Sequence, residues 1–262
     1  MKKNVLFKVF GGFALCLSVA IPSPAQLKQV TPASSLPFCF MGYDPSVCGR
    51  LFAATSASFY DAVYPRAYVS DDNGETWRCT FTFTDPKSIP EYGKQGRIKE
   101  VYPSGNSDEM YVIVASSSSN DTDGLYRVNT KTGEYRHVDV PDASDGYTME
   151  YFDSSADGKY MVLCATANIN YTKFTKVYYT ENCGENWKLI YNFADHDYVH
   201  IGNVKLSPDD PHKIYLFRSG GPTGVYGSIF ISEDSGDTWK ETLPGIETQA
   251  VWINPKNPND IY

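Results

Sequence analysis

The stretch Ser232-Glu233-Asp234-Ser235-Gly236-Asp237-Thr238-Trp239 decides how this sequence is organised, because it is written more than once. A full copy stands upstream as Ser70-Asp71-Asp72-Asn73-Gly74-Glu75-Thr76-Trp77, and a close copy lies between the two as Thr180-Glu181-Asn182-Cys183-Gly184-Glu185-Asn186-Trp187. A worn copy, Asn129-Thr130-Lys131-Thr132-Gly133-Glu134-Tyr135-Arg136, keeps the glycine. The copies recur about every 50 to 60 residues, which is a period typical of structural repeats.

Each copy follows an alternating apolar run that is typical of a β-strand, and a second run follows it, so the copy is predicted to be a hairpin turn. Asp72 and Asp234 are expected to accept hydrogen bonds from backbone N–H groups, and the glycines are expected to adopt φ > 0. The tryptophans are expected to fold back as apolar plugs. The residues with this structural role are Ser70, Asp72, Gly74, Trp77, Thr180, Asn182, Gly184, Trp187, Ser232, Asp234, Gly236 and Trp239.

A second repeated phrase marks where each unit begins. Residues 204–215 match residues 251–262, and looser copies lie at 101–111, 151–161 and 41–52. In each copy a short strand enters a turn rich in Pro, Asp, Asn or Gly, and a second apolar strand leaves it. Two strands here and two around the hairpin turn make four strands per unit, which predicts one blade of a β-propeller.

The expected domain boundaries follow from these two phrases. Residues 26–37 are a linker and residues 38–262 a β-propeller, with blades at about 38–95, 96–146, 147–199 and 200–247 and a fifth that begins at 248. Because a propeller closes only when its last blade meets the first, we expect an incomplete chain whose remaining blades lie beyond its C-terminus.

The pattern Ser-x-Asp-x-Gly-x-Thr-Trp resembles the Asp-box, or BNR, repeat of sialidases, xyloglucan-hydrolysing glycoside hydrolases, sortilin-type receptors and photosystem assembly factors. The resemblance runs from about residue 38 to the last residue. It implies an all-β propeller of four-stranded antiparallel blades. It also implies that the repeated turns lie at the periphery, away from the ligand face, so that their aspartates are structural and not catalytic.

Residues 1–25 are predicted to be a secretory signal peptide. Lys2, Lys3 and Lys8 accompany an apolar stretch from Val9 to Ile21, and the small residues up to Ala25 offer a cleavage site. This stretch is short for a membrane span, and no later stretch is long and apolar enough to be one. We therefore expect a secreted, periplasmic or cell-surface protein without membrane insertion.

The amino-acid composition limits the classes of molecule that the protein is expected to bind. A net charge of −8 argues against nucleic acid, because a phosphate backbone would be repelled. Aromatic residues make up 15% of the chain, including 20 tyrosines, which suits sheet packing and also stacking on sugar rings. We expect no nucleic-acid partner and no cofactor, and the candidate partners are a glycan or an exported protein or peptide.

The cysteines indicate at least one free thiol and no metal site. Cys16 leaves with the signal peptide, and an odd number remains, namely Cys39, Cys48, Cys79, Cys164 and Cys183. Cys39 and Cys48 flank a turn and are the best local candidates for a bridge, but proximity along the chain does not supply the required geometry. No cysteine or histidine spacing is typical of zinc, so we expect no metal.

The order of the strands predicts where a ligand would bind. If both repeated phrases lie on one rim, the loops between second and third strands and the links between blades share the opposite rim. Function is expected there, because loops that differ between repeats carry it. The weak ligand candidates on this rim are Arg97 and Arg218, together with Asp195, His196 and Tyr198 in the link between the third and fourth blades. The alternative for this link is that its polar side chains only cap turns.

Residue-by-residue comparison with the resembling enzymes leaves two functions open. The first predicted strand lacks the sialidase arginine, and Arg97-Ile98 is followed by Lys99 instead of proline. Ser56 stands where the resemblance to xyloglucan-hydrolysing enzymes would place a catalytic Asp, which leaves Asp61 as a weak catalytic candidate. The favoured interpretation is a glycan- or protein-recognition scaffold, and the alternative is a xyloglucanase-like or sialidase-like glycoside hydrolase with carboxylates on the rim.

Overall fold

The computed structural model describes most of the chain between residues 31 and 261. The described residues are 31–32, 34, 37–44, 46–57, 64–84, 96–115, 124–141, 147–169, 172–195, 201–220, 227–245, 251–254, 256–258 and 260–261. The expected signal peptide 1–25 lies outside them, as do most of the linker 26–37 and the candidates Asp61, His196 and Tyr198. No helix in the described part of the chain has the length and apolar character needed to cross a membrane.

The described residues form sixteen β-strands in four groups of four. The first two groups are β1 (Phe38–Tyr43), β2 (Leu51–Ala57), β3 (Arg66–Ser70), β4 (Arg78–Thr82), then β5 (Gly96–Pro103), β6 (Glu109–Ala115), β7 (Gly124–Asn129), β8 (Tyr135–Val138). The next two are β9 (Thr148–Ser154), β10 (Met161–Ile169), β11 (Thr172–Thr180), β12 (Lys188–Asp195), then β13 (Ile201–Leu206), β14 (Ile214–Arg218), β15 (Ser228–Ser232), β16 (Lys240–Thr242).

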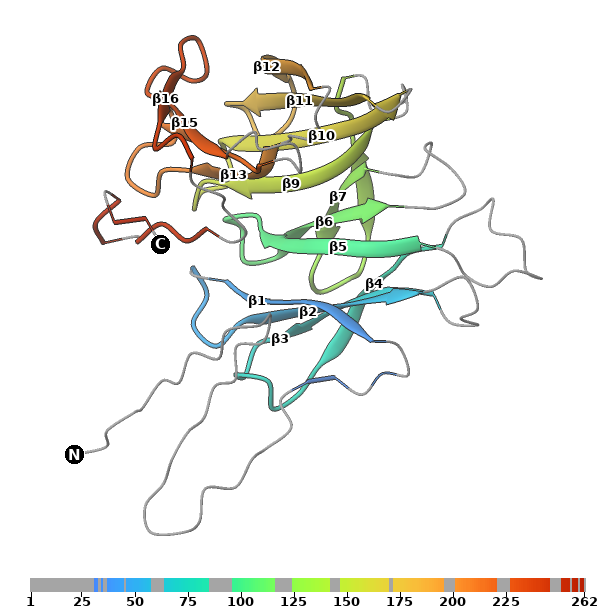
Figure 1. Cartoon of the computed structure of the whole chain (residues 1–262). Helices are drawn as coiled ribbons and strands as arrows, with labels where there is room; N and C mark the ends of the chain where they lie inside the picture. Colours follow the sequence, from blue (N-terminus) through green and yellow to red (C-terminus); the bar gives the residue numbers. More distant parts are fainter. Residues whose placement is uncertain are drawn as a thin grey trace, which may run out of the picture.

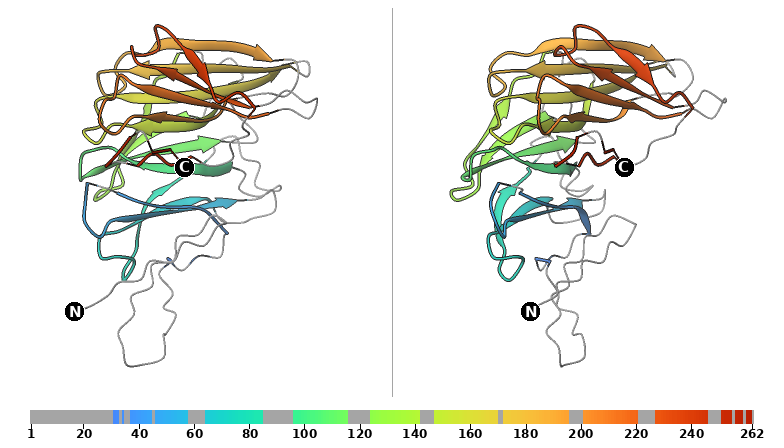
Figure 2. Two further views of the ribbon diagram at one scale, coloured as in Figure 1. Left: turned by 60° about the vertical axis from the view of Figure 1, so that its left-hand side comes forward. Right: turned by 90° about the vertical axis from the view of Figure 1, so that its left-hand side faces the viewer.

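Within each group consecutive strands pair in antiparallel fashion, so each group is a four-stranded meander. Figure 1 shows the groups following one another in chain order, from the blue strands around β1 to the orange strands around β15. The side views in Figure 2 show the same succession of sheets. The predicted all-β propeller, built of four-stranded antiparallel blades, is confirmed.

The first two blades are joined in a way that the sequence did not predict. Ser56 and Ala57 at the end of β2 pair with Arg97 and Gly96 at the start of β5, so the eight strands form one sheet. The cause is a difference in strand length, because β1 begins opposite Thr55. The last residues of β2 therefore reach beyond their own blade and offer backbone groups to the next.

Apolar side chains between successive blades form the core. The cluster between the first and second blades includes Phe52 and Phe81 from one side and Ile98 and Val112 from the other, all nearly inaccessible to solvent. Equivalent clusters lie between the second and third and between the third and fourth blades. Burying each large side chain contributes about 1.5–3 kcal/mol, so the blades stabilise one another face to face.

A short segment after β16 packs on the fourth blade. Ile253 forms an isolated bridge with Ile261, and both contact a cluster that contains Tyr215 and Phe217. The segment thus covers apolar side chains of the fourth blade, in the same way that each earlier blade is covered by the blade that follows it.

Three repeated turns, which we call the tryptophan turns (residues 70–77, 180–187 and 232–239), are held by their own side chains. In the third, Ser232 Oγ accepts a hydrogen bond from Gly236 N (2.8 Å) and donates one to Asp234 Oδ1 (2.8 Å). Asp234 accepts two more, from Thr238 N (2.8 Å) and Thr238 Oγ1 (2.6 Å). The first turn repeats all four hydrogen bonds. The second repeats three of them, with Asn186 in place of the threonine whose hydroxyl group donates the fourth.

Each tryptophan turn has two consecutive residues with positive φ. The glycines have φ near +85°, and the residues before them, Asn73, Cys183 and Ser235, have φ near +58°. Hydrogen bonds from the side chains to the backbone offset the strain that the non-glycine residues carry in this conformation.

The tryptophan turns share a rim with the turns between first and second strands. The N–H groups of Asn73, Cys183 and Ser235 each donate to a carbonyl of the other turn in the same blade, on Gly49, Lys159 and His212, at 2.9 Å. The opposite rim therefore carries the starts of the first strands and the ends of the second strands.

The candidate bridge between Cys39 and Cys48 is not formed, and Cys79, Cys164 and Cys183 form no disulfide with any described residue either. Cys39 lies near the start of β1 and Cys48 in the turn after its end. At about 3.3 Å per residue this separates them by more than the 4.4–6.8 Å that a disulfide allows between Cα atoms. The Cys39 thiol instead donates a hydrogen bond to the Ile98 carbonyl (2.8 Å).

Candidate functional site

The first strands of the blades lie against one another and carry the charged residues of the interior. β1 contacts β5, β5 contacts β9, and β9 contacts β13. Buried apolar residues of β5, β9 and β13 enter the inter-blade cores, as Ile98 and Val101 do on β5. Next to these core residues in the sequence stand the charged residues Lys99, Glu100, Glu150, Asp153 and Lys205.

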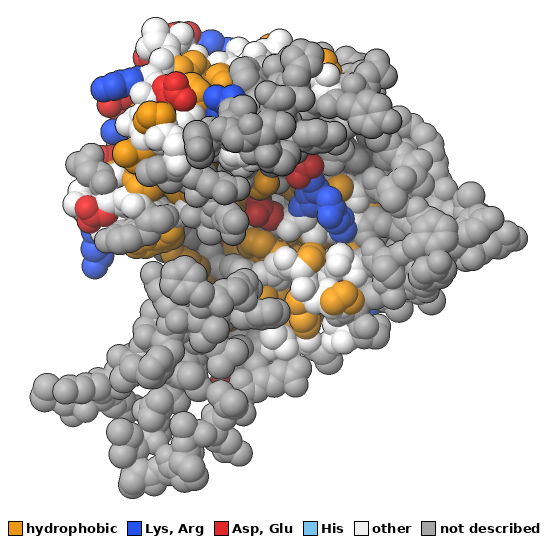
Figure 3. Space-filling view, viewed as in Figure 1, with side chains coloured by type: hydrophobic (Ala, Val, Ile, Leu, Met, Phe, Trp, Pro, Cys, Tyr) orange, Lys and Arg blue, Asp and Glu red, His pale blue; other side chains and the backbone are white. Residues whose placement is uncertain are grey.

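A hollow of about 310 Å³ opens beside these strands, and we call it the inner-strand hollow. It is lined by Cys39, Ser56, Arg97, Ile98, Lys99, Glu100 and Glu150. These residues come from β1, β2, β5 and β9, so three blades contribute to it. The space-filling view in Figure 3 shows acidic and basic side chains side by side in the recessed middle of the visible face.

Two charges of the hollow neutralise each other. The Lys99 ammonium forms an ion pair with Glu150 Oε2, and its side chain is only 9% exposed. Thr166 on β10 donates a hydrogen bond to Glu150 Oε1 (3.4 Å), which orients the carboxylate. A nearly buried ammonium needs such a partner, because an isolated charge in the interior is strongly destabilising.

Glu100 is the unusual carboxyl of the hollow. Its pKa is raised to about 7, mainly by burial; the neighbouring carboxylates Asp153 and Glu150 also raise it, whereas Lys205 and Lys99 lower it. Within the described residues, Glu100 makes neither a hydrogen bond nor an ion pair. It therefore holds a proton during part of the time near neutral pH.

A second charged group links three blades beneath the hollow. Asp153 on β9 accepts a hydrogen bond from Leu206 N on β13 (2.9 Å), and Lys205 Nζ lies 3.8 Å from its other oxygen. Lys205 also lies 6.0 Å from the centre of the Tyr102 ring on β5. Burial raises the pKa of Asp153, and Lys205 counters this. These contacts hold the first strands in register.

The structure places two of the predicted ligand residues on the expected rim. Arg97, at the start of β5, is exposed and lines the inner-strand hollow. Arg218 ends β14 opposite Ile201 and Ser228, and its side chain is partly buried. The two arginines belong to the second and fourth blades, so no arginine triad is assembled from them. Of the predicted link cluster, Asp195 is the last residue of β12, paired with Lys173, and its side chain lies outside the described residues.

Sequence reasoning missed Lys99, Glu100, Glu150, Asp153 and Lys205. A usable signal was present, because each stands next to a core residue of a predicted first strand. A charged side chain so close to the core needs a partner or a function, since charged groups are rarely buried alone.

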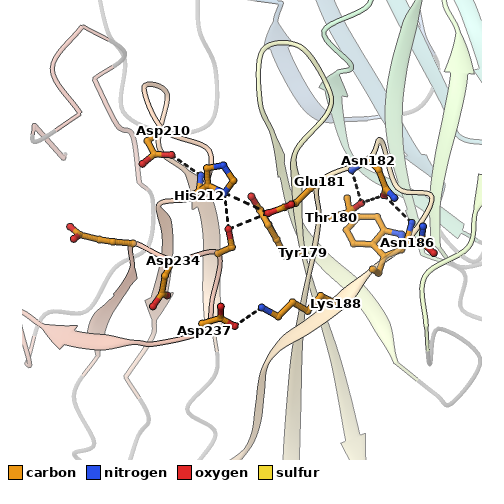
Figure 4. A pocket seen from close by; sticks show the side chains of 13 residues that line it. Tyr179, Thr180, Glu181, Asn182, Asn186, Lys188, Asp210, His212, Asp234 and Asp237 are labelled. Atoms are coloured by element: carbon orange, nitrogen blue, oxygen red, sulfur yellow. Dashed lines mark hydrogen bonds and ion pairs between the residues drawn. The ribbon is translucent and has the colours of Figure 1, made fainter.

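A second concave region lies on the other rim, between the second and third tryptophan turns. This turn groove has a volume of about 940 Å³ and is lined mainly by polar side chains, including Glu181, Asp210, His212, Asp234 and Asp237 (Figure 4). Lys188 crosses it to pair with Asp237 (2.5 Å).

The Glu181, His212 and Ser235 side chains meet in the turn groove, but they are not arranged as a catalytic triad. His212 Nδ1 lies 2.8 Å from Ser235 Oγ and 3.5 Å from Glu181 Oε1, so one ring nitrogen faces both partners (Figure 4). A triad requires the base to contact nucleophile and acid through different nitrogens. Ser235 Oγ donates directly to Glu181 (3.3 Å). The group joins the third blade to the fourth.

Among the described residues, no group of three or more His, Cys, Asp or Glu side chains is arranged to hold a metal ion.

Comparison with known proteins finds similar folds among solved structures but no similar sequence among family models or curated proteins. No family model matches the chain. No curated protein matches it either. Among solved structures, the GH74 xyloglucanase from Xanthomonas campestris aligns with a TM-score of 0.59 and 17% identity over 84% of this chain and 34% of that one. An ancestral GH74 enzyme aligns with a TM-score of 0.55 and 14% identity over 85% of this chain and 31% of that one.

A third structure, the GH93 α-L-arabinofuranosidase of Fusarium graminearum in complex with arabinobiose, aligns with a TM-score of 0.51 and 14% identity over 84% of this chain and 68% of that one. The chain thus spans about a third of the length of the GH74 structures. At these identities the likeness concerns the fold: the chain has the architecture of part of a β-propeller of the kind that glycoside hydrolases use.

Proposed function

We propose that this protein is an exported β-propeller that recognises a glycan in the inner-strand hollow. The observation that carries the proposal is that one hollow, lined by three blades, holds the exposed guanidinium of Arg97 and the carboxyl of Glu100, which has no partner among the described residues. Ser56 adds a hydroxyl group. A few convergent polar groups in a concave site are what orient a ligand, and sugars present hydroxyl groups in several directions.

The likeness to glycoside hydrolase propellers favours a glycan over an exported protein or peptide, although at the level of fold alone. Export is inferred from residues 1–25, and the net charge of −8 argues against a nucleic-acid partner. The role of the tryptophan turns is structural in this proposal. Their side chains are engaged with their own backbone.

A second candidate function, glycoside hydrolysis, is favoured by Glu100. A general acid needs a carboxyl that keeps its proton near the working pH, and the pKa of about 7 meets this need. An inverting or retaining hydrolase needs a second carboxylate, for which Glu150 in the same hollow and Asp61 are the candidates.

The test is to screen the purified full-length protein on a glycan array and to measure reducing-sugar release from each glycan that binds. Arg97→Ala and Glu100→Gln are the site variants, and Glu241→Gln on the exposed face of β16 is the matched control. Binding that Arg97→Ala abolishes, without sugar release, supports the recognition scaffold.

Sugar release that disappears in Glu100→Gln supports the hydrolase instead. Failure to bind any glycan, together with capture of an exported protein that Arg97→Ala prevents, would replace the glycan by a protein ligand. Glycan binding that neither site variant weakens would place the site elsewhere and overturn the proposal.

A further inference from the structure

Two charges of opposite sign in the inner-strand hollow have no partner among the residues that the structure describes. Arg97 is exposed and makes no hydrogen bond or ion pair within the described residues, and the same is true of Glu100. The other two charges of the hollow, Lys99 and Glu150, are paired with each other. A ligand that enters the hollow therefore meets a guanidinium and a carboxyl that no described side chain engages.

The charge of Glu100 is set by groups on three strands. Lys99 and Arg97 share its own strand β5, Glu150 and Asp153 face it from β9, and Lys205 faces it from β13. Each lysine already has a carboxylate partner, Glu150 for Lys99 and Asp153 for Lys205. The three carboxyl groups thus outnumber the two ammonium groups, and Glu100 is the carboxyl that forms no ion pair with either lysine.

Because the surplus carboxyl is also half-buried, its charged form is disfavoured and its pKa is raised to about 7. Below that pH, Glu100 is a neutral acid that donates an O–H hydrogen bond. Above it, Glu100 is an anion that only accepts hydrogen bonds and repels other anions.

We propose that the hollow takes a saccharide that bears a carboxylate, paired with Arg97, and that Glu100 determines this specificity by holding a proton when the ligand binds. The inference rests on the proposed glycan-binding function and deepens it. Arg97 supplies the fork of donors that matches a carboxylate. Protonated Glu100 supplies one further donor, whereas ionised Glu100 places a second negative charge in the same hollow.

The experiment compares oligomers of uronic acids with the same oligomers after reduction of their carboxyl groups to alcohols. Affinity is measured by calorimetry at pH 5.5 and pH 8.5 for the full-length protein and its variants. A sugar carboxylic acid is ionised at both values, so a change reports on the protein. We expect the wild type to bind a uronate oligomer about tenfold or more tightly at the lower pH, since a pKa of about 7 lies between the two conditions.

Substitutions of Glu100 and Arg97 test the contribution of each side chain separately. Glu100→Gln, which keeps a neutral donor at every pH, is expected to bind the uronate oligomer with equal affinity at both values. Arg97→Ala is expected to lose the preference for the uronate over its reduced form. Glu241→Gln, exposed on β16, is expected to behave as the wild type. A carbon-13 titration of the Glu100 carboxyl without ligand, with an expected midpoint near 7, gives a measurement that does not depend on binding.

The outcomes distinguish this inference from the proposed function. If neither oligomer binds at either pH, and no other glycan does, the glycan-binding function itself fails. If neutral saccharides bind in an Arg97-dependent way while the uronate gains nothing at low pH, the function stands and the inference is wrong. A Glu100 midpoint near 4 would also overturn it.

Discussion

Gly236 of the third tryptophan turn lies so close to Ile190 of the preceding blade that a Cβ atom on the glycine would stand 2.5 Å from Ile190 Cβ. Its φ of +85° also disfavours any side chain. We expect Gly236→Ala to lower the free energy of unfolding by about 2–5 kcal/mol, because overpacking of roughly 1–3 kcal/mol adds to left-handed backbone strain of roughly 1–2 kcal/mol. Urea denaturation followed by tryptophan fluorescence measures the change.

The matched control for that prediction is Gly245. It has a similar φ of +92°, but a Cβ atom there would have no neighbour within 4 Å. Gly245→Ala should therefore lose only the backbone contribution, about 1–2 kcal/mol. Equal losses in the two variants would show that the contact with Ile190 adds nothing.

The aspartates of the tryptophan turns predict a loss of stability in acid. Hydrogen bonds from Thr76 and Thr238 lower the pKa of Asp72 and Asp234 to about 2. Because each folded-state pKa lies below the ordinary value of 3.8, the stabilisation is complete above that value and is lost as the pH falls toward 2. Carbon-13 titration of the two carboxyls should give midpoints near 2.

The double variant Asp72→Asn with Asp234→Asn tests the same point through stability. Asn182 shows that an amide oxygen can hold the turn, since it accepts hydrogen bonds from Asn186 N (3.0 Å) and Thr180 Oγ1 (2.8 Å). The variant should fold, and its denaturation midpoint should vary less than that of the wild type between about pH 5 and pH 2. An unchanged acid dependence would exclude these carboxylates as its cause.

Two tryptophans in equivalent turns differ in their hydrogen bonds. Trp239 Nε1 donates to the Ile190 carbonyl (3.1 Å), whereas the buried Nε1 of Trp187 makes no hydrogen bond within the described residues. Substitution by Phe removes the N–H group and a similar amount of apolar surface in both. We expect Trp239→Phe to destabilise the protein by about 1 kcal/mol more than Trp187→Phe, which is the net contribution of one such bond. Denaturation of both variants checks the difference, and equal effects would contradict it.

The sequence was sufficient to predict the blades because they repeat. The spacing of the glycines at 74, 184 and 236 and the strands around them depend on local turn chemistry, which a sequence displays directly. The positive φ of Asn73, Cys183 and Ser235 was not predicted, because a left-handed cysteine or serine has no distinct sequence signal. The pairing of β2 with β5 also escaped prediction, since it depends on where β1 begins.

The candidate site was predicted only in part. Arg97 was recognised from the rim on which it lies, but Glu100, three residues further on, was not. Its unusual protonation depends on burial and on Glu150, Asp153 and Lys205, which come from other blades. Such a property belongs to the packed arrangement of strands, and no single stretch of sequence contains it.

The ion pair between Lys99 and Glu150 predicts a non-additive pair of substitutions. Lys99→Met removes the ammonium and leaves a partly buried carboxylate beside Glu100, so we expect a loss of about 2 kcal/mol, less than for a fully buried pair because Glu150 is 28% exposed. Adding Glu150→Met removes the uncompensated charge and should restore most of that loss, since a buried pair can often be replaced by apolar side chains at little cost. A double-mutant cycle in urea measures the coupling. If the two losses simply add, the pair contributes nothing to the arrangement of the first strands, and the hollow must be held by the inter-blade cores alone.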